Sequence, residues 1–209
     1  MKICIIVAME SEYALLENLV EGGRIGRHEV HLSRCGIGKV NAAVGAVEII
    51  ASQKPDLVIS SGVAGAMSGK VHTGDFVVSA EIAYHDAWYG EGNVWGQIQG
   101  LPARFSAPAG PVSKAAALGA HRGLIVSGDR FVDTKADVLG ILGNFPDALA
   151  VDMESGALAQ VCTLKGIPFL SLRLISDSDE IARDESYRNF WQTAGEQSFR
   201  LLKAFLESI

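Results

Sequence analysis

The sequence has few cysteines and no dense cluster of basic residues. Its three cysteines, Cys4, Cys35 and Cys162, are odd in number, lie far apart and fall within apolar runs. Neither a disulfide framework nor a metal site is therefore indicated, and we expect the thiols to be reduced and buried. The net charge of −6 and the lack of a Lys/Arg cluster argue against a nucleic-acid partner, which would require a basic stripe. A small molecule is the better candidate for the ligand.

Long hydrophobic runs are also missing. The apolar run Lys2–Ala8 is too short to cross a membrane and is followed by no small-residue cleavage site, so we expect a cytoplasmic protein with no membrane partner. With 209 residues, of which 48% are hydrophobic, the chain can bury a full sheet with helices on both faces. We expect one domain spanning residues 1–209.

Short apolar runs alternate with segments of helical spacing, without a linker or a repeat. This alternation predicts an α/β fold with a mixed central sheet flanked by helices on both faces. The predicted strands are Lys2–Ala8, Val30–Arg34, Asp56–Ser60, Phe76–Tyr84, Gly123–Val126, Ala148–Val151 and Pro168–Leu174. The predicted helices are Glu10–Leu19, Val40–Ser52, Ser113–Leu118, Ser155–Lys165 and Glu185–Ser208.

Two carboxylates follow two of these strands. Glu154 comes after Ala148–Val151, Asp177 comes after Pro168–Leu174, and a predicted helix lies between them. A right-handed crossover would make the two strands parallel and bring both acids to one edge, where open α/β sheets bind their ligands. Either acid alone would fit a helix cap or a turn. The pair favours a functional site.

Two glycine-rich segments are predicted as turns after strands. Cys35–Lys39 lacks both the third glycine of the dinucleotide fingerprint and the Gly-Lys-Ser/Thr ending of the P-loop. Ser61–Gly65 would let the backbone pass close to a ligand, and a tight structural turn explains it equally well. Lys39, His85 and Asp86 also lie near strand ends, where each alone fits a surface or hydrogen-bonded role better than catalysis.

A set of motifs spans nearly the whole chain. In order, these motifs are Ala8–Glu12, Gly36–Ala43, Ser61–Gly65, Tyr84–Ala87, Ser127–Val132, Val151–Glu154 and Ile175–Asp177. With this combination the chain resembles the 5′-methylthioadenosine/S-adenosylhomocysteine nucleosidases, of the purine nucleoside phosphorylase and uridine phosphorylase superfamily. The resemblance implies a nucleoside phosphorylase-like fold, a homodimer, and hydrolysis of the N-glycosidic bond between adenine and a 5′-thio-substituted ribose without a metal or cofactor.

The resemblance also implies catalytic roles. Asp177 would protonate adenine at N7, oriented by Ser176, since adenine is a poor leaving group unless it is protonated. Glu12 would be the general base for water, and Arg173 would help to hold that water. One acid and one base flanking a glycosidic carbon follow the logic of inverting glycoside hydrolases. Without the resemblance, Glu12 in a first helical turn would be explained by the helix dipole alone.

Substrate contacts are implied in the same way. The Glu154 carboxylate would accept the 2′- and 3′-hydroxyl protons of ribose, Phe131 would stack on adenine, and Val132 would offer backbone groups to its edge. The other matching contact positions are Met9, Ile37, Gly65, Met153 and Tyr187, the last where many members have phenylalanine.

Departures from the family fall mainly around the 5′ group. The segment Trp88–Trp95 is less like the family than its flanks, and Gln99 lies where a proline of the neighbouring subunit often closes the 5′ pocket. The region between Leu19 and Val30 is short, which predicts the loss of an edge element from the sheet. The run Val40–Val44, with Trp88 and Trp95, would supply a dimer interface or part of the core.

Other functions stay open beside the nucleosidase. A futalosine or aminofutalosine hydrolase would use the same bond chemistry with another 5′ group. A purine nucleoside phosphorylase would need a basic, hydroxyl-rich phosphate pocket, where Val63 and Glu12 stand instead. A non-catalytic nucleoside-binding protein would need neither Glu12 nor Asp177.

Overall fold

The computed structural model describes residues 1–20, 22–67, 69–177 and 200–209, and for Asp177 only the backbone. The strands are β1 (Lys2–Val7), β2 (Arg24–Ile25), β3 (His28–Arg34), β4 (Leu57–Ala66), β5 (Phe76–Tyr84), β6 (Phe105–Ser106), β7 (His121–Ser127), β8 (Ala148–Asp152) and β9 (Phe169–Asp177). The helices are α1 (Glu10–Glu17), the 3₁₀ helix Asn18–Val20, α2 (Lys39–Gln53), α3 (Ala109–Ala117), α4 (Lys135–Asn144), α5 (Ser155–Lys165) and residues 200–208.

The described strands form one mixed sheet that closes partly on itself. The path runs β2-β3-β1-β4-β8-β7-β5-β6, and β9 pairs with both β4 and β5. The pairings therefore make a ring of β4, β8, β7, β5 and β9, from which β1, β3 and β2 extend on one side and β6 on the other. The ring brings together strand ends that are far apart in the sequence, at the carboxyl end of β4.

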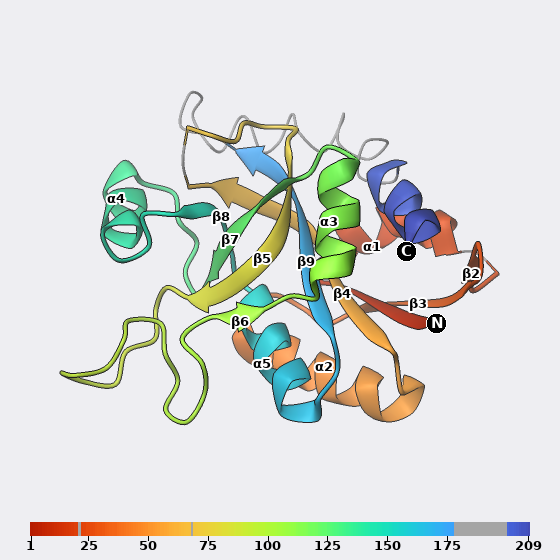
Figure 1. Cartoon of the computed structure of the whole chain (residues 1–209), viewed down its shortest axis with the longest axis horizontal. Coiled ribbons are helices and arrows are strands. Elements are labelled where there is room, and N and C mark those ends of the chain that lie inside the picture. The colour runs from red at the N-terminus through yellow and green to blue at the C-terminus, as the bar shows by residue number, and fades with distance from the viewer. Residues whose placement is uncertain (21, 68, 178–199) are drawn as a thin grey trace.

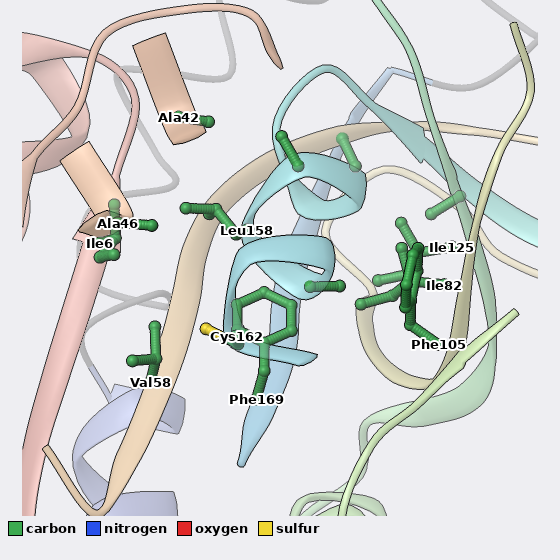
Figure 2. Packing of buried hydrophobic residues seen from close by; sticks show 14 of the residues in the cluster. Ile6, Ala42, Ala46, Val58, Ile82, Phe105, Ile125, Leu158, Cys162 and Phe169 are labelled. Atoms are coloured by element: carbon green, nitrogen blue, oxygen red, sulfur yellow. The ribbon is translucent and has the colours of Figure 1, made fainter. Parts of the chain in front are cut away.

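Helices cover both faces of the sheet, which confirms the predicted α/β class. Alternate residues of β1 point to opposite sides: Cys4 and Ile6 belong to the core under α2 and α5, and Ile3 and Ile5 to the core under α1, α3 and residues 200–208. Figure 1 shows α2 and α5 together on one side and α1 and α3 on another. In the first core, Leu158 of α5 packs among side chains from the sheet (Figure 2). Cys4 and Cys162 are buried as predicted, whereas Cys35 is only half-buried.

Two expectations about strands are wrong. Residues Ser61–Gly65 do not form a turn, because β4 continues through them while paired along its length with β9. The strands β8 and β9 are not parallel neighbours: β9 runs parallel to β4, and β8 runs antiparallel to it. The backbones of Val151 and Asp177 nevertheless both pair with Gly65 of β4, so the two strand ends still meet.

Other elements differ from the prediction, either in their bounds or because they were not predicted. The edge of the sheet is not lost after Leu19, because the short strand β2 pairs antiparallel with β3. Helix α3 begins at Ala109 rather than Ser113, since Pro108 and Pro111 occupy its N-cap and first turn, where a missing N–H costs nothing. Helix α4 was not predicted. Of the predicted closing helix Glu185–Ser208, residues 185–199 lie outside the described residues.

None of the helices in the described part of the chain is both long enough and apolar enough to span a membrane.

Candidate active site

A pocket lies at the carboxyl ends of β1, β4 and β8. It brings together most of the residues proposed for the site, from six separate segments of the chain. The predicted residues that line it are Met9, Glu12, Ile37, Gly65, Phe131, Val132, Met153, Glu154 and Ser176.

Glu12 is buried at the floor of this pocket. It is the third residue of α1, and its side chain turns back so that Oε2 accepts hydrogen bonds from the backbone N–H groups of Ala8 (2.9 Å) and Met9 (3.0 Å). The other oxygen, Oε1, accepts from the N–H of Val63 on β4 over 3.0 Å. A carboxylate offers about four acceptor sites, so these three donors fix its orientation and leave one site on Oε1.

Arg173 approaches the same place from β9. A Cβ added to Gly62 would lie 2.4 Å from Glu12 Oε1 and 2.6 Å from Arg173 Nη1, so both groups close around a backbone that carries no side chain. The Arg173 side chain is buried and donates from Nε to Asp152 Oδ2 (2.7 Å) and from Nη2 to Ser60 Oγ (2.8 Å). Burial alone would lower its pKa, but the charges of Asp152, Glu154 and Glu12 outweigh that effect and raise it. Arg173 is therefore a permanent cation beside Glu12.

Asp152 has a central role that the sequence did not reveal. Its Oδ1 accepts from the backbone N–H groups of Glu154 (3.3 Å) and Ser155 (3.1 Å), while Oδ2 receives Arg173 Nε and the Ser155 hydroxyl. The Ser155 hydroxyl lies 2.7 Å from Ser171 Oγ. The acidic residue at the very end of β8 was the signal available in the sequence. Its partner Arg173 lies on β9, which is separated from β8 in the sequence by helix α5, so the sequence did not show the pair.

Glu154 faces the pocket from the start of α5. Its Oε1 accepts from the N–H of Gly38, at the N-terminus of α2, over 2.9 Å. Burial and, secondly, the charge of Asp152 raise the pKa of Glu154 to about 7, against the opposing influence of Arg173 and of the Gly38 N–H. A carboxyl group in this position can accept or donate hydrogen bonds near neutral pH.

The opposite wall of the pocket is apolar. Phe131 is 59% exposed and Val132 is buried, and both lie on the loop between β7 and α4. Ser176 of β9 is buried at the pocket wall, with its hydroxyl 3.4 Å from the carbonyl oxygen of Ala64. A flat exposed ring beside a polar floor suits a ligand with an aromatic part and a hydroxyl-bearing part.

Two predicted residues have side chains outside the described structure. The backbone of Asp177 pairs with Gly65 at the end of β9, and its side chain lies outside the described structure. Tyr187 lies within residues 178–199, also outside the described residues.

The divergent segment forms no part of the pocket wall in its own chain. The rings of Trp88 and Trp95 stack on each other at 5.6 Å, and Trp95 Nε1 donates to the carbonyl oxygen of His85. Neither tryptophan nor Gln99 lines the pocket. Lys39 and Asp86 form an ion pair of 2.8 Å, so the hydrogen-bonded role expected for both is confirmed.

No group of three or more His, Cys, Asp or Glu side chains in the described ranges is placed to hold a metal ion.

The chain matches a family model described as the phosphorylase superfamily over residues 2–207. Among solved structures it is similar to the 5′-methylthioadenosine/S-adenosylhomocysteine nucleosidase from Neisseria meningitidis in complex with methylthio-immucillin-A, with 34% identity, a TM-score of 0.91, and coverage of 100% of this chain and 99% of that one. It is similar to the S-adenosylhomocysteine nucleosidase from Streptococcus pyogenes in complex with 5-methylthiotubericidin, with 30% identity, a TM-score of 0.91, and coverage of 100% and 97%.

The futalosine hydrolase of Helicobacter pylori shares the fold. Its TM-score is 0.89 at 24% identity, with coverage of 100% of this chain and 98% of that one.

Proposed function

The chain belongs to the phosphorylase superfamily, within its family of 5′-methylthioadenosine/S-adenosylhomocysteine nucleosidases, and we propose that it hydrolyses the N-glycosidic bond of 5′-methylthioadenosine and S-adenosylhomocysteine, releasing adenine and the 5′-thio-ribose. The observation that carries the proposal is the close approach of both Glu12 and Arg173 to Gly62, beside a pocket that Glu12 and Glu154 line.

Glu12 is the general base of the proposed reaction. Its remaining acceptor site lies on the oxygen nearest to Gly62 and Arg173. A water bound there would donate to Glu12 and sit beside the guanidinium of Arg173. As the glycosidic bond breaks and the sugar gains oxocarbenium character, this water loses its proton to Glu12 and attacks the anomeric carbon.

Asp177 is the proposed acid, oriented by Ser176. Its backbone position beside Gly65 supports this role, because Gly65 lines the pocket. A proton delivered to N7 neutralises the charge that the departing adenine would otherwise carry, so the acid and base act on opposite sides of the bond.

In the proposed complex, ribose contacts the side of the pocket that Glu154 lines, and adenine contacts the side that Phe131 lines. Glu154 supplies carboxylate oxygens to the 2′- and 3′-hydroxyl groups, beside Met153, while Met9 and Ile37 contact the sugar or thioether side. Adenine stacks on Phe131, and the backbone of Val132 meets its edge. The exposed ring of Phe131 supports this arrangement, because a free aromatic face is available for stacking.

The charges around the pocket favour hydrolysis over phosphorolysis. Glu12, Asp152 and Glu154 line it, and Arg130 is the one cationic side chain among the described lining residues. Arg130 is itself paired with Asp137 at 2.5 Å. Arg173, beside Glu12, is held by Asp152, so a phosphate dianion would meet the acids Glu12 and Glu154 and be repelled, whereas a neutral water would not.

We also propose a homodimer built on α2 and the Trp88–Trp95 segment. Val40, Val44 and Val47 are 73%, 53% and 44% exposed, at spacings that place them on one face of α2. Leu164 of α5 is exposed as well. Their exposure argues against the alternative that this run is core, and an apolar face of this kind is typical of subunit interfaces. The cytoplasmic location expected from the sequence stays a prediction.

The test is adenine release from 5′-methylthioadenosine, S-adenosylhomocysteine and aminofutalosine, first in phosphate-free buffer and then with phosphate. We expect release without phosphate and no increase when phosphate is added. If adenine were released fastest from aminofutalosine, the preferred substrate would be aminofutalosine and not a 5′-thio nucleoside. If adenine were released only with phosphate present, the protein would be a phosphorylase and not a hydrolase.

A further inference from the structure

We propose that Asp129 is a positioning residue that holds the base-stacking loop, residues 128–134, against the N-terminus of α2. This inference rests on the proposed function, because it assumes that adenine binds on Phe131. Asp129 itself does not line the pocket.

The loop needs an anchor near Phe131. It connects β7 to α4, and on its far side Val132 is buried in the small core under α4. The Phe131 ring is mostly exposed, so packing within the chain does not fix it. The position of the ring therefore depends on how the backbone on its near side, at Gly128 and Asp129, is held.

The N–H of Gly128 donates to the carbonyl oxygen of Asp152 over 3.1 Å, and Asp129 adds two further hydrogen bonds. Its N–H donates to Asp86 Oδ2 over 2.8 Å, and its Oδ1 accepts from the N–H of Lys39 over 2.7 Å. The Lys39 ammonium donates to the same Asp86 oxygen over 2.8 Å, which closes a ring of three residues from three segments. The cation offsets the repulsion between the two acids, and charged partners make these bonds stronger than neutral ones.

The hydrogen bonds between Asp129, Lys39 and Asp86 also connect to the ribose side of the pocket. Helix α2 has Gly38 as its N-cap, which has no side chain to accept from the first N–H groups of the helix. Two acids from elsewhere do so instead: Glu154 accepts from Gly38, and Asp129 accepts from Lys39. A Cβ on Gly38 would lie only 3.0 Å from Asp129 Oδ1. The N-terminus of α2 thus joins the carboxylate proposed for ribose to the loop proposed for adenine.

Removal of the Asp129 carboxylate should loosen the loop and weaken base binding, although the N–H groups of Gly128 and Asp129 keep their partners. Asp129→Ala loses the acceptor for Lys39, and we expect adenine to bind about tenfold more weakly, the size of one charge-assisted hydrogen bond. Asp129→Asn keeps an acceptor oxygen in the same place, so it should bind adenine within about threefold of the wild type. Asp133→Ala is the matched control: it removes an exposed acid of the same loop that has no hydrogen-bond partner in the described ranges.

The experiment is calorimetric titration of adenine into the wild type, Asp129→Ala, Asp129→Asn, Asp133→Ala, Phe131→Ala and the double variant Asp129→Ala/Phe131→Ala, with Tm measured for each. If Asp129 acts through Phe131, the loss caused by Phe131→Ala will be smaller in the Asp129→Ala background. Additive losses, or unchanged affinity in a folded Asp129→Ala protein, would overturn the inference. A lower Tm with additive losses would identify a purely structural role, and Asp129→Asn keeps the test available if Asp129→Ala does not fold.

The two proposals fail in different ways. A wild-type protein that neither binds nor releases adenine refutes the proposed function. A wild type that binds adenine, with Asp129→Ala binding it equally well, refutes only the role of Asp129.

Discussion

Arg173 and Asp152 form an ion pair of 2.7 Å in which both side chains are buried, at 1% and 2% exposure. Asp152 also holds the N–H groups of Glu154 and Ser155. One acid therefore orients the arginine beside Glu12 and the turn that presents Glu154.

Loss of this pair should cost stability. Asp152→Asn leaves the Arg173 cation buried without its counter-charge, and we expect the free energy of unfolding to fall by about 3 kcal/mol. Urea denaturation measures this loss. Glu29→Gln, which breaks the exposed pair with Lys2, should cost less than about 1 kcal/mol. Equal losses would mean that burial does not matter for the Asp152 pair.

Gly62→Ala should lower activity and also cost stability, because Gly62 has a φ of +152°, which alanine rarely adopts. The new Cβ would displace the carboxylate of Glu12 and the guanidinium of Arg173, and misplacement of catalytic groups by about 1 Å lowers kcat by roughly 100-fold. Gly140→Ala is the control, since nothing lies within 4 Å of its added Cβ in helix α4; it should keep kcat and gain stability. Steady-state kinetics of adenine release measure kcat for both variants. An unchanged kcat in Gly62→Ala would show that catalysis does not depend on the close approach of Glu12 and Arg173 to Gly62.

Glu12→Gln should abolish the activation of water. We expect kcat to fall by about 1,000-fold, within the range of a general base, while adenine binding stays close to that of the wild type. Glu10→Gln, at an exposed acid two residues earlier in α1, provides the control and should keep full activity. Retained hydrolysis in Glu12→Gln would place the base elsewhere.

Asp177→Asn should stop the departure of adenine while nucleoside binding persists. The sharp comparison is with a 4-nitrophenyl riboside, whose leaving group departs without protonation. We expect kcat for the adenine nucleoside to fall by about 100-fold or more, and the nitrophenyl compound to be affected little. Equal losses for both substrates would contradict a role in protonation.

Glu154 should make stability depend on pH. Its pKa is raised from 4.5 to about 7 in the folded chain, so between these values the native state holds a proton that the unfolded chain has released. Unfolding then becomes easier as pH rises from about 4.5 to 7. Glu154→Gln removes this titration and keeps an acceptor for Gly38, so its Tm relative to the wild type should rise over that interval and level off above it. A difference that does not change with pH would argue against the raised pKa.

Local patterns in the sequence predicted many of the elements. Helix α5 has the predicted bounds, Ser155–Lys165, because its apolar spacing is helical and Gly166 with Pro168 ends it. Helix α4 was missed although a local signal was present. Thr134 caps it by accepting from the N–H of Asp137, the threonine-x-x-acid pattern of a helix start.

The path of β4 could not be predicted in the same way. Ser61–Gly65 has the composition of a turn, yet these residues remain extended because β9, more than 100 residues later in the chain, pairs with them. Pairing between distant strands outweighs local preference at this point.

For the candidate site as well, some features followed from the sequence and others only from the tertiary structure. The sequence by itself determined the candidate residues, because the motifs around Glu12, Phe131 and Glu154 resemble one family, and these side chains do line one pocket. Only the tertiary structure decided how they act together: the pairing of Arg173 with Asp152, and the closure of Glu12 and Arg173 around Gly62. These contacts join residues on three different strands and on helix α1, so they exist only once the ring of strands has closed.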